Sequence, residues 1–398
     1  MAVKITKPEI NIREKIAELD KPSGIAGEAM LRAETPQEQF NLINAGRRNL
    51  IINGAMRIAQ RGTSASVTGS GFTYETIDRI KIARTGTDQL VVTASQETDA
   101  PDGFTYSHKL DVTTAESVID AGEYYRGLQY TIEGQDLTGI GYGTSNAKPV
   151  TLSFWVKSSR AGTYSVGFFR DESTDRIYST SYTVDAVGVW EYKSIVIEGD
   201  TTSAITADNS GRLALIWYLM AGSTFTGGSL TGWGNYSAAG DLAKDHNVAW
   251  GTSTDDYWQI TGVQLELGKI ATPFEHRSYG EELALCQRYY NRIESLDSDN
   301  TWFTSGFSYS TVYAHGVIQF PVPMRDVPSL KHTNTATDYK VWHGANVNTI
   351  CNSVPSADGV NLSTARIAFP VASGLTVGSP CLFRANATGS FLAFDAEL

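Results

Sequence analysis

Aromatic side chains are the residues of this sequence whose types and spacing most clearly suggest chemistry. The chain contains 8 Trp, 19 Tyr and 15 Phe. Trp233, Tyr236 and Trp250 lie in residues 222–256, a long loop-like segment rich in Gly, Ser, Asn and Asp. Sugars stack their apolar C–H faces on such rings while polar neighbours bind the hydroxyls. These three residues are therefore candidate glycan contacts. The alternative is that they pack at a sheet edge or in a subunit interface.

Two further tryptophans, Trp302 and Trp342, lie in the C-terminal part and are also candidate glycan contacts. The other strand-region tryptophans occur inside alternating apolar patterns, which predicts that they pack in a core. These residues are Trp155, Trp190, Trp217 and Trp258.

Signals of catalysis or metal binding are poor. The sequence has no Gly-x-Ser-x-Gly elbow, no P-loop and no His-Glu-x-x-His motif. The acidic turns at residues 171–175 and 255–256 lack the spacing of a calcium loop, so solvated turns are favoured over calcium sites. Cys286 is expected in a core rather than as a nucleophile. We predict no catalytic residue, metal or cofactor, although a pair of carboxylates brought together by folding stays open.

Composition excludes several classes of partner. With 32 Lys and Arg against 43 Asp and Glu, the net charge is −11. This argues against nucleic-acid binding and against docking on anionic lipid. No apolar run is long enough to span a membrane, and the first residues lack the apolar stretch of a secretory signal. Three cysteines are too few for a disulfide scaffold.

The elements that must position these residues are mainly strands. Residues 47–275 contain short alternating runs between Gly-rich turns, which predicts a jelly-roll β-sandwich. In residues 150–157, for example, Val150, Leu152, Phe154 and Val156 alternate with more polar residues. Residues 213–220 are apolar at almost every position, as in a central strand covered on both faces.

Three other segments flank or follow this sandwich. Residues 1–46 contain two helical patterns that are too short to be stable alone, so they are predicted to pack on the body, a sister chain or a larger assembly. Residues 276–294 are predicted as a linker helix, capped by Ser278. Residues 295–398 return to strands and are predicted to form a small distal β-domain.

Three stretches carry a family resemblance. They are RNLIINGAMRIAQRG (residues 48–62, followed by Tyr74 and Asp78-Arg79), YWQITGVQLELGKIATPFEHRSYGEELALCQRYYNRI (residues 257–293), and FPVPMRDVPSL (residues 320–330) with the terminal FDAEL. This combination resembles tail-fibre or appendage proteins of tailed bacteriophages. The sequence departs from the family's pattern at Ile80, where the family has Trp.

The resemblance implies a virion structural protein, made in the host cytoplasm, whose body is a carbohydrate-binding-module-like jelly roll. It implies a homotrimer that is attached to other virion proteins through residues 1–46. It also implies reversible, multivalent attachment to host surface polysaccharide, without catalysis.

Two rival interpretations stay open on the sequence. A tailspike-like polysaccharide depolymerase would usually carry the regular rungs of a parallel β-helix, and no such repeat is visible. A purely structural collar or head-fibre component would bind no receptor. A secreted bacterial carbohydrate-binding module is a third alternative, disfavoured by the missing signal.

Overall fold

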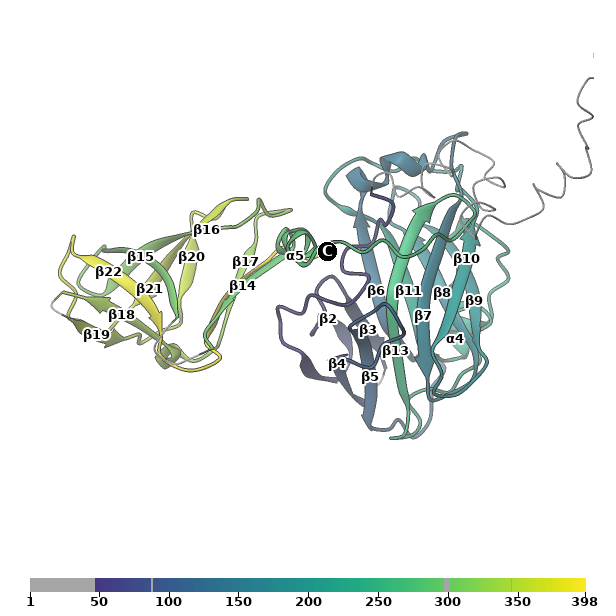
Figure 1. The fold of residues 1–398 in the computed structure, drawn as a ribbon, viewed down its shortest axis with the longest axis horizontal. Coiled ribbons are helices and arrows are strands. Elements are labelled where there is room, and N and C mark those ends of the chain that lie inside the picture. The colour runs from purple at the N-terminus through teal and green to yellow at the C-terminus, as the bar shows by residue number, and fades with distance from the viewer. Residues whose placement is uncertain (1–46, 87–88, 297–300, 345) are drawn as a thin grey trace, which may run out of the picture.

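The computed structural model describes residues 47–86, 89–296, 301–344 and 346–398 (Figure 1). The predicted anchoring segment, residues 1–46, lies outside these described residues. The described chain forms a large β-sandwich followed by a smaller β-domain. The expected mainly-β class with a jelly-roll sandwich is confirmed.

The sandwich consists of two facing antiparallel sheets. The six-stranded sheet contains, in spatial order, β1 (Ser64–Thr68), β4 (Val91–Glu97), β5 (Ser107–Thr114), β13 (Tyr257–Leu267), β7 (Val150–Ser158) and β10 (Glu191–Ile197). The seven-stranded sheet contains β12 (Gly234–Asn235), β9 (Arg176–Val184), β8 (Gly162–Arg170), β11 (Gly211–Ala221), β6 (Tyr124–Glu133), β3 (Lys81–Thr85) and β2 (Gly71–Tyr74). A 3₁₀ segment, η1 (Gly134–Ile140), follows β6.

The core of the sandwich follows from alternation along the strands. On β7, the side chains of Val150, Leu152, Phe154 and Val156 are all fully buried in one apolar cluster. Each such side chain stabilises the folded state by about 1.5–3 kcal/mol relative to remaining in water. The alternation predicted from the sequence is therefore confirmed.

Strand β11 is buried on both faces, as its continuous apolar sequence predicts. It pairs with β6 on one side and β8 on the other. Trp217 points into the sandwich core, whereas Ile216 and Tyr218 belong to a second cluster on the outer face. The segment that contains α4 (Ser223–Thr226) and η2 (Ala239–Asp241) covers that outer face through Leu242 and Ala243.

The linker helix is shorter than predicted. Helix α5 spans Tyr279–Gln287, and the Ser278 hydroxyl accepts a hydrogen bond from the Glu281 backbone N–H, as expected of an N-cap. Residues 290–294, which the sequence prediction placed in the helix, instead form strand β14 (Tyr290–Glu294). They do so because their backbone pairs with β23 (Phe391–Asp395), about a hundred residues further along the chain.

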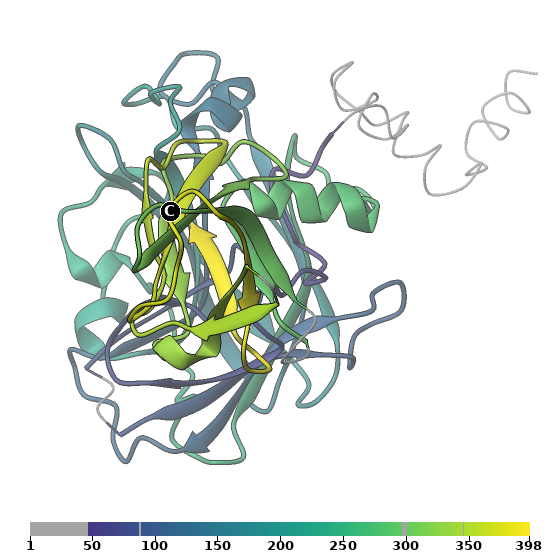
Figure 2. The same cartoon turned by 90° about the vertical axis from the view of Figure 1, so that its left-hand side faces the viewer.

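The smaller domain, which Figure 2 shows in front of the sandwich, has its own apolar core and two sheets. The three-stranded sheet contains β14, β23 and β17 (Ser329–His332). The seven-stranded sheet contains β19 (Val347–Ile350), β18 (Tyr339–His343), β22 (Pro380–Ala385), β15 (Trp302–Ser308), β16 (Tyr313–Gln319), β21 (Thr364–Pro370) and β20 (Ser356–Asp358). A 3₁₀ turn, η3 (Ala336–Asp338), precedes β18.

A buried set of charges joins the two domains; we call it the joint and define it by Arg61, Asp78, Arg79 and Glu397. The Arg79 guanidinium pairs with the Glu397 carboxylate and donates a hydrogen bond to the Thr131 carbonyl at 2.7 Å. Arg61 lies 3.4 Å from Glu397 and 3.6 Å from Asp78. The side chains of these four residues are all more than nine-tenths buried.

Aromatic rings complete the joint. The guanidinium carbon of Arg79 lies 3.5 Å from the ring centroid of Tyr289, and that of Arg61 lies 3.6 Å from the centroid of Tyr290. Such cation–π contacts strengthen when water is excluded. The Tyr74 hydroxyl donates to the Leu398 carbonyl at 2.6 Å. The stretches that carry the family resemblance therefore meet here and hold the domains together.

Candidate functional site

Trp250 is not a surface residue. Its side chain is 0% exposed, and its ring lies 5.2 Å from that of Tyr125 inside the sandwich core. A sugar cannot stack on an indole that is enclosed on every side, so we remove Trp250 from the candidate glycan contacts. Its Gly-rich surroundings in the sequence suggested exposure, but the segment that carries it folds into the sandwich.

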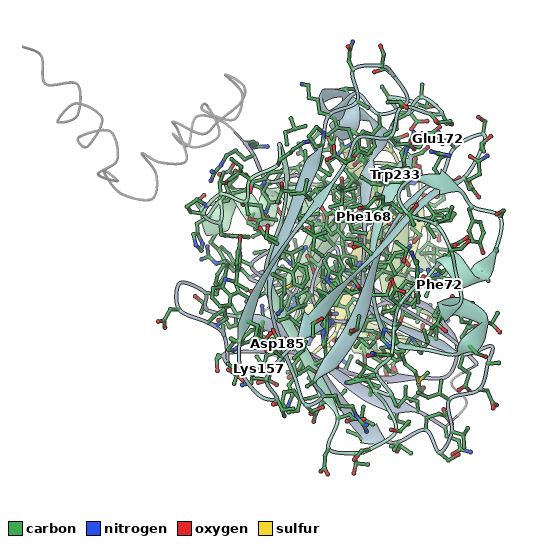
Figure 3. The ribbon with its side chains drawn as sticks, turned by 90° about the vertical axis from the view of Figure 1, so that its right-hand side faces the viewer. Phe72, Lys157, Phe168, Glu172, Asp185 and Trp233 are labelled. Atoms are coloured by element: carbon green, nitrogen blue, oxygen red, sulfur yellow. The ribbon has the colours of Figure 1, made fainter. Side chains whose placement is uncertain are left out.

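Trp233 is half-buried at one end of the sandwich, where Figure 3 shows it beside Phe168. Its ring lies 5.6 Å from Tyr142 and 6.4 Å from Phe168, both in edge-on geometry. Its indole N–H donates to the Glu198 carbonyl at 2.8 Å. These contacts fit packing at a sandwich edge, which was the alternative to sugar contact.

Trp302 and Trp342 do meet, on the outward face of the seven-stranded sheet of the distal domain. Their ring centroids are 5.9 Å apart, and the Trp302 side chain is 46% exposed. The Arg384 guanidinium carbon lies 4.3 Å from the Trp302 centroid. The Trp342 indole N–H donates to the Asn346 side chain at 2.9 Å, which fixes the ring. An aromatic ring held in this way loses little entropy when a ligand binds.

A hollow of about 670 Å³ lies beside this pair; we call it the distal cleft. Its lining comes from adjacent strands and their ends, and consists of Ser305, Gly306, Phe307, Trp342, His343, Gly344, Ser379, Pro380, Cys381 and Leu382. In the sheet register, Leu382 lies between Trp342 and Ser305, so it forms the floor of the cleft. The size suits a ligand of a few sugar rings.

Sequence reasoning missed Phe307, which lines the distal cleft and is 51% exposed. Because β22 runs between β15 and β18, Phe307 on β15 and Trp342 on β18 lie on opposite sides of it. The hydroxyls of Ser305 and Ser379 provide polar groups near these rings. The sequence signal that could have identified Phe307 was its position close to Trp302, in the same short strand.

Tyr236 lines a second hollow, of about 480 Å³, on the outer face of the sandwich; we call it the sandwich hollow. Its floor includes Ala214 and Ile216 of β11 and Gln129 and Thr131 of β6. Tyr236, which is 38% exposed, forms one wall of it. The structure therefore places the five candidate residues in four separate environments.

The described part of the chain contains few candidate residues for catalysis or metal binding. None of its His, Cys, Asp and Glu side chains gather in groups of three that could hold a metal ion. Asp256, from one acidic turn, pairs with Arg160 at 2.5 Å and accepts hydrogen bonds from the backbone N–H groups of Gly251 and Ser253. Cys286 is fully buried, as predicted, and burial raises the pKa of its thiol. Helices in these residues are all too short or too polar to cross a membrane.

Comparisons with known proteins find no match to a family model and no match among curated proteins. Among solved structures, the enzymatically active domain of tailspike protein 4 from bacteriophage CBA120 is 13% identical, with a TM-score of 0.30. That similarity covers 55% of this chain and 21% of the tailspike chain.

Two sugar-binding structures are similar at the same level. A putative sugar-binding protein from Bacteroides thetaiotaomicron is 12% identical with a TM-score of 0.29, and the match covers 56% of this chain and all of the other. The family 11 carbohydrate-binding module of a Clostridium thermocellum cellulosomal cellulase is 10% identical with a TM-score of 0.25, covering 57% and 97%. At these scores the comparisons establish no family for this chain.

Proposed function

We propose that this chain is a virion structural protein, a phage tail fibre or similar appendage, that attaches to host surface glycans by non-catalytic binding. The distal cleft is the observation that carries this proposal. Phe307 and Trp342 offer ring faces for sugar C–H groups, and Ser305 and Ser379 offer hydroxyls for sugar hydroxyls. Trp302 extends the aromatic surface beyond the cleft.

The chemistry of the distal cleft supports binding rather than cleavage. Glycoside hydrolysis commonly uses two carboxylates, about 5–9.5 Å apart, on either side of the bond. The described residues that line the distal cleft include no Asp or Glu. A sugar in this cleft would therefore meet aromatic and apolar side chains, hydroxyls, the His343 imidazole and the Cys381 thiol, but no carboxylate of the described residues.

The proposal includes assembly as a homotrimer attached to other virion proteins through residues 1–46. Linked copies raise the effective concentration of each site, so weak binding at one cleft becomes tight attachment of the particle. Light scattering tests the assembly. A molar mass near three times 43.2 kDa is expected, and a monomer would contradict the trimer for the isolated chain.

Binding of the purified chain to lipopolysaccharide and capsule preparations tests the function. We expect Trp342→Ala to weaken this binding by about tenfold or more, because stacking of a nucleic-acid base on one aromatic ring is worth about 1–3 kcal/mol and we take sugar stacking to be of similar size. Phe72→Ala is the matched control, since Phe72 is 59% exposed on edge strand β2 of the sandwich, whereas the cleft lies on the distal domain. Equal losses in both variants would contradict a specific role for the cleft.

The same samples distinguish the rival functions. Release of reducing sugar from these polysaccharides would identify a depolymerase instead. Absence of binding to every preparation, together with failure to compete with particle adsorption, would favour a purely structural collar or head-fibre component.

A further inference from the structure

The sandwich hollow has two chemically different sides. Phe169 of β8 and Tyr236 form an aromatic side, with ring centroids 5.5 Å apart and planes inclined at 72°. The backbone N–H of Tyr236 donates to the Asp175 carbonyl at 2.9 Å, which ties this side to the turn between β8 and β9. Arg126 of β6 and Lys81 of β3 lie on the opposite side, separated from β8 by strand β11.

The two cations have no anionic partner within the described ranges. No carboxylate there lies within 4.0 Å of Lys81 Nζ or of the Arg126 guanidinium. Arg126 donates to the Gln129 side chain at 3.1 Å and lies 4.5 Å from the Tyr124 ring, but its buried Nε has no hydrogen-bond partner. Lys81 Nζ lies 5.4 Å from the centroid of the Tyr74 ring.

Arg212 and Glu397, two other charged residues near the hollow, are already paired. Arg212 at its edge lies 2.7 Å from Asp208 and 3.7 Å from Glu172. Glu397, the carboxylate behind Lys81, is bound by Arg79 and Arg61 in the joint. The carboxylate of Asp171 is exposed at the rim. Most cations elsewhere in the described chain are paired, so two adjacent unpaired ones are unusual.

Their proximity has an electrostatic consequence. Burial lowers the pKa of Lys81; Glu397 opposes this effect, and the charges of Arg79 and Arg126 add to it. Two positive charges that repel each other in a partly buried hollow destabilise the empty protein. A bound carboxylate would relieve that repulsion and give the orphaned Arg126 Nε an acceptor.

We propose that the sandwich hollow is a second saccharide site, which binds a hexuronic acid unit through Lys81 and Arg126. The sugar ring would stack on Tyr236 and Phe169 while its carboxylate faces the two cations. Gln129 and Thr131 on the floor would bind its hydroxyls. The inference rests on the proposed function only in taking the ligand to be a saccharide; the residues are separate from the distal cleft.

Calorimetry on the full chain tests this inference with a matched ligand pair. The probes are α-1,4-linked trigalacturonate and neutral trigalactose, which differ at C6. We expect the acidic probe to bind about tenfold more tightly than the neutral one, because a hydrogen bond to a charged group is stronger than one between neutral groups. Added salt should weaken only the acidic probe.

Variants assign the effect to residues. Lys81→Met should reduce the preference for trigalacturonate over trigalactose by about tenfold. Lys148→Met, at an exposed lysine outside the hollow, should leave that preference unchanged. Tyr236→Ala should weaken both probes. If Lys81→Met does not fold, the salt dependence and probe preference of the unaltered chain still decide the question.

Three results would overturn the inference: equal affinity for the two probes, an unchanged preference in folded Lys81→Met, or inorganic phosphate binding as tightly as trigalacturonate. The last result would mean that the aromatic side contributes nothing. Trp342→Ala separates this site from the distal cleft. Retained trigalacturonate binding in that variant supports an independent site, even where attachment to host polysaccharide fails.

Discussion

The joint and the sandwich hollow use cationic side chains and tyrosine rings in opposite ways. In the joint, Arg61 and Arg79 are enclosed by carboxylates and tyrosine rings. In the sandwich hollow, Lys81 and Arg126 lie near tyrosine rings but lack a carboxylate among the described residues. Paired charges and enclosed rings hold domains together, whereas unpaired charges and open rings are available to a ligand.

This contrast changes how the family resemblance is understood. Asp78-Arg79, the tyrosines after α5 and the acidic residues near the C-terminus all lie in the joint. They are distant from the rings of the distal cleft. Residues that carry a resemblance therefore perform a structural task here, and the proposed binding residues lie outside those stretches, in β15, β18 and β22.

Breaking the joint should have the largest effect. We expect Arg79→Met to lower the free energy of unfolding by about 3–5 kcal/mol, because it removes the closer of the two arginines from the buried Glu397 carboxylate and leaves only Arg61, at 3.4 Å. Urea unfolding measures this change. Arg366→Met is the control, since the Arg366–Asp358 pair is exposed, and no measurable change is expected there. A similar loss in both variants would contradict the special role of the joint.

Two tryptophan substitutions sharpen the contrast between enclosed and open rings. Trp250→Ala should cost about 3–5 kcal/mol of stability, because it leaves a large cavity in the sandwich core. Trp342→Ala should change stability by less than about 1 kcal/mol and should instead weaken glycan binding. Thermal unfolding and polysaccharide binding, measured on both variants, check the pair. A destabilised Trp342→Ala with normal binding would reverse the assignment.

The joint should also respond to pH. Burial raises the pKa of Asp78 from its ordinary value of 3.8 to about 6. The folded state therefore takes up this proton before the unfolded state does, and the contribution of Asp78 to stability rises as pH falls from about 7 to about 4. A two-unit shift corresponds to at most about 3 kcal/mol.

The unaltered chain and Asp78→Asn, compared by urea unfolding at pH 7 and pH 5, isolate this contribution. The variant keeps an acceptor oxygen for the Gln60 backbone N–H but loses the second oxygen, which accepts from the Gln60 side-chain amide. That loss is present at both pH values and cancels in the comparison. We expect the unaltered chain to gain stability relative to the variant at pH 5. A difference that is the same at both pH values would show that Asp78 stays ionised.

Much of the fold was predictable because it depends on local pattern. Alternation identified the buried face of β7, and a continuous apolar run identified β11 as a central strand. The Ser278 cap marked the start of α5. The end of that helix was not predictable, because Tyr290 leaves helical geometry to pair with Asp395 in a strand far along the chain.

The candidate site also divides into features that local sequence predicts and features that depend on distant segments. The sequence by itself determined which residues are aromatic, that they follow strand patterns, and that the chain is acidic and mainly β. Only the tertiary structure decided that Trp250 is enclosed while Trp342 stays accessible, although both precede a glycine or a His-Gly pair in polar surroundings. It also decided that Lys81 and Arg126 line one hollow with no carboxylate partner among the residues that the structure describes. The physical reason is that exposure and charge pairing depend on which distant segment covers a strand, and alternation along that strand does not contain this information.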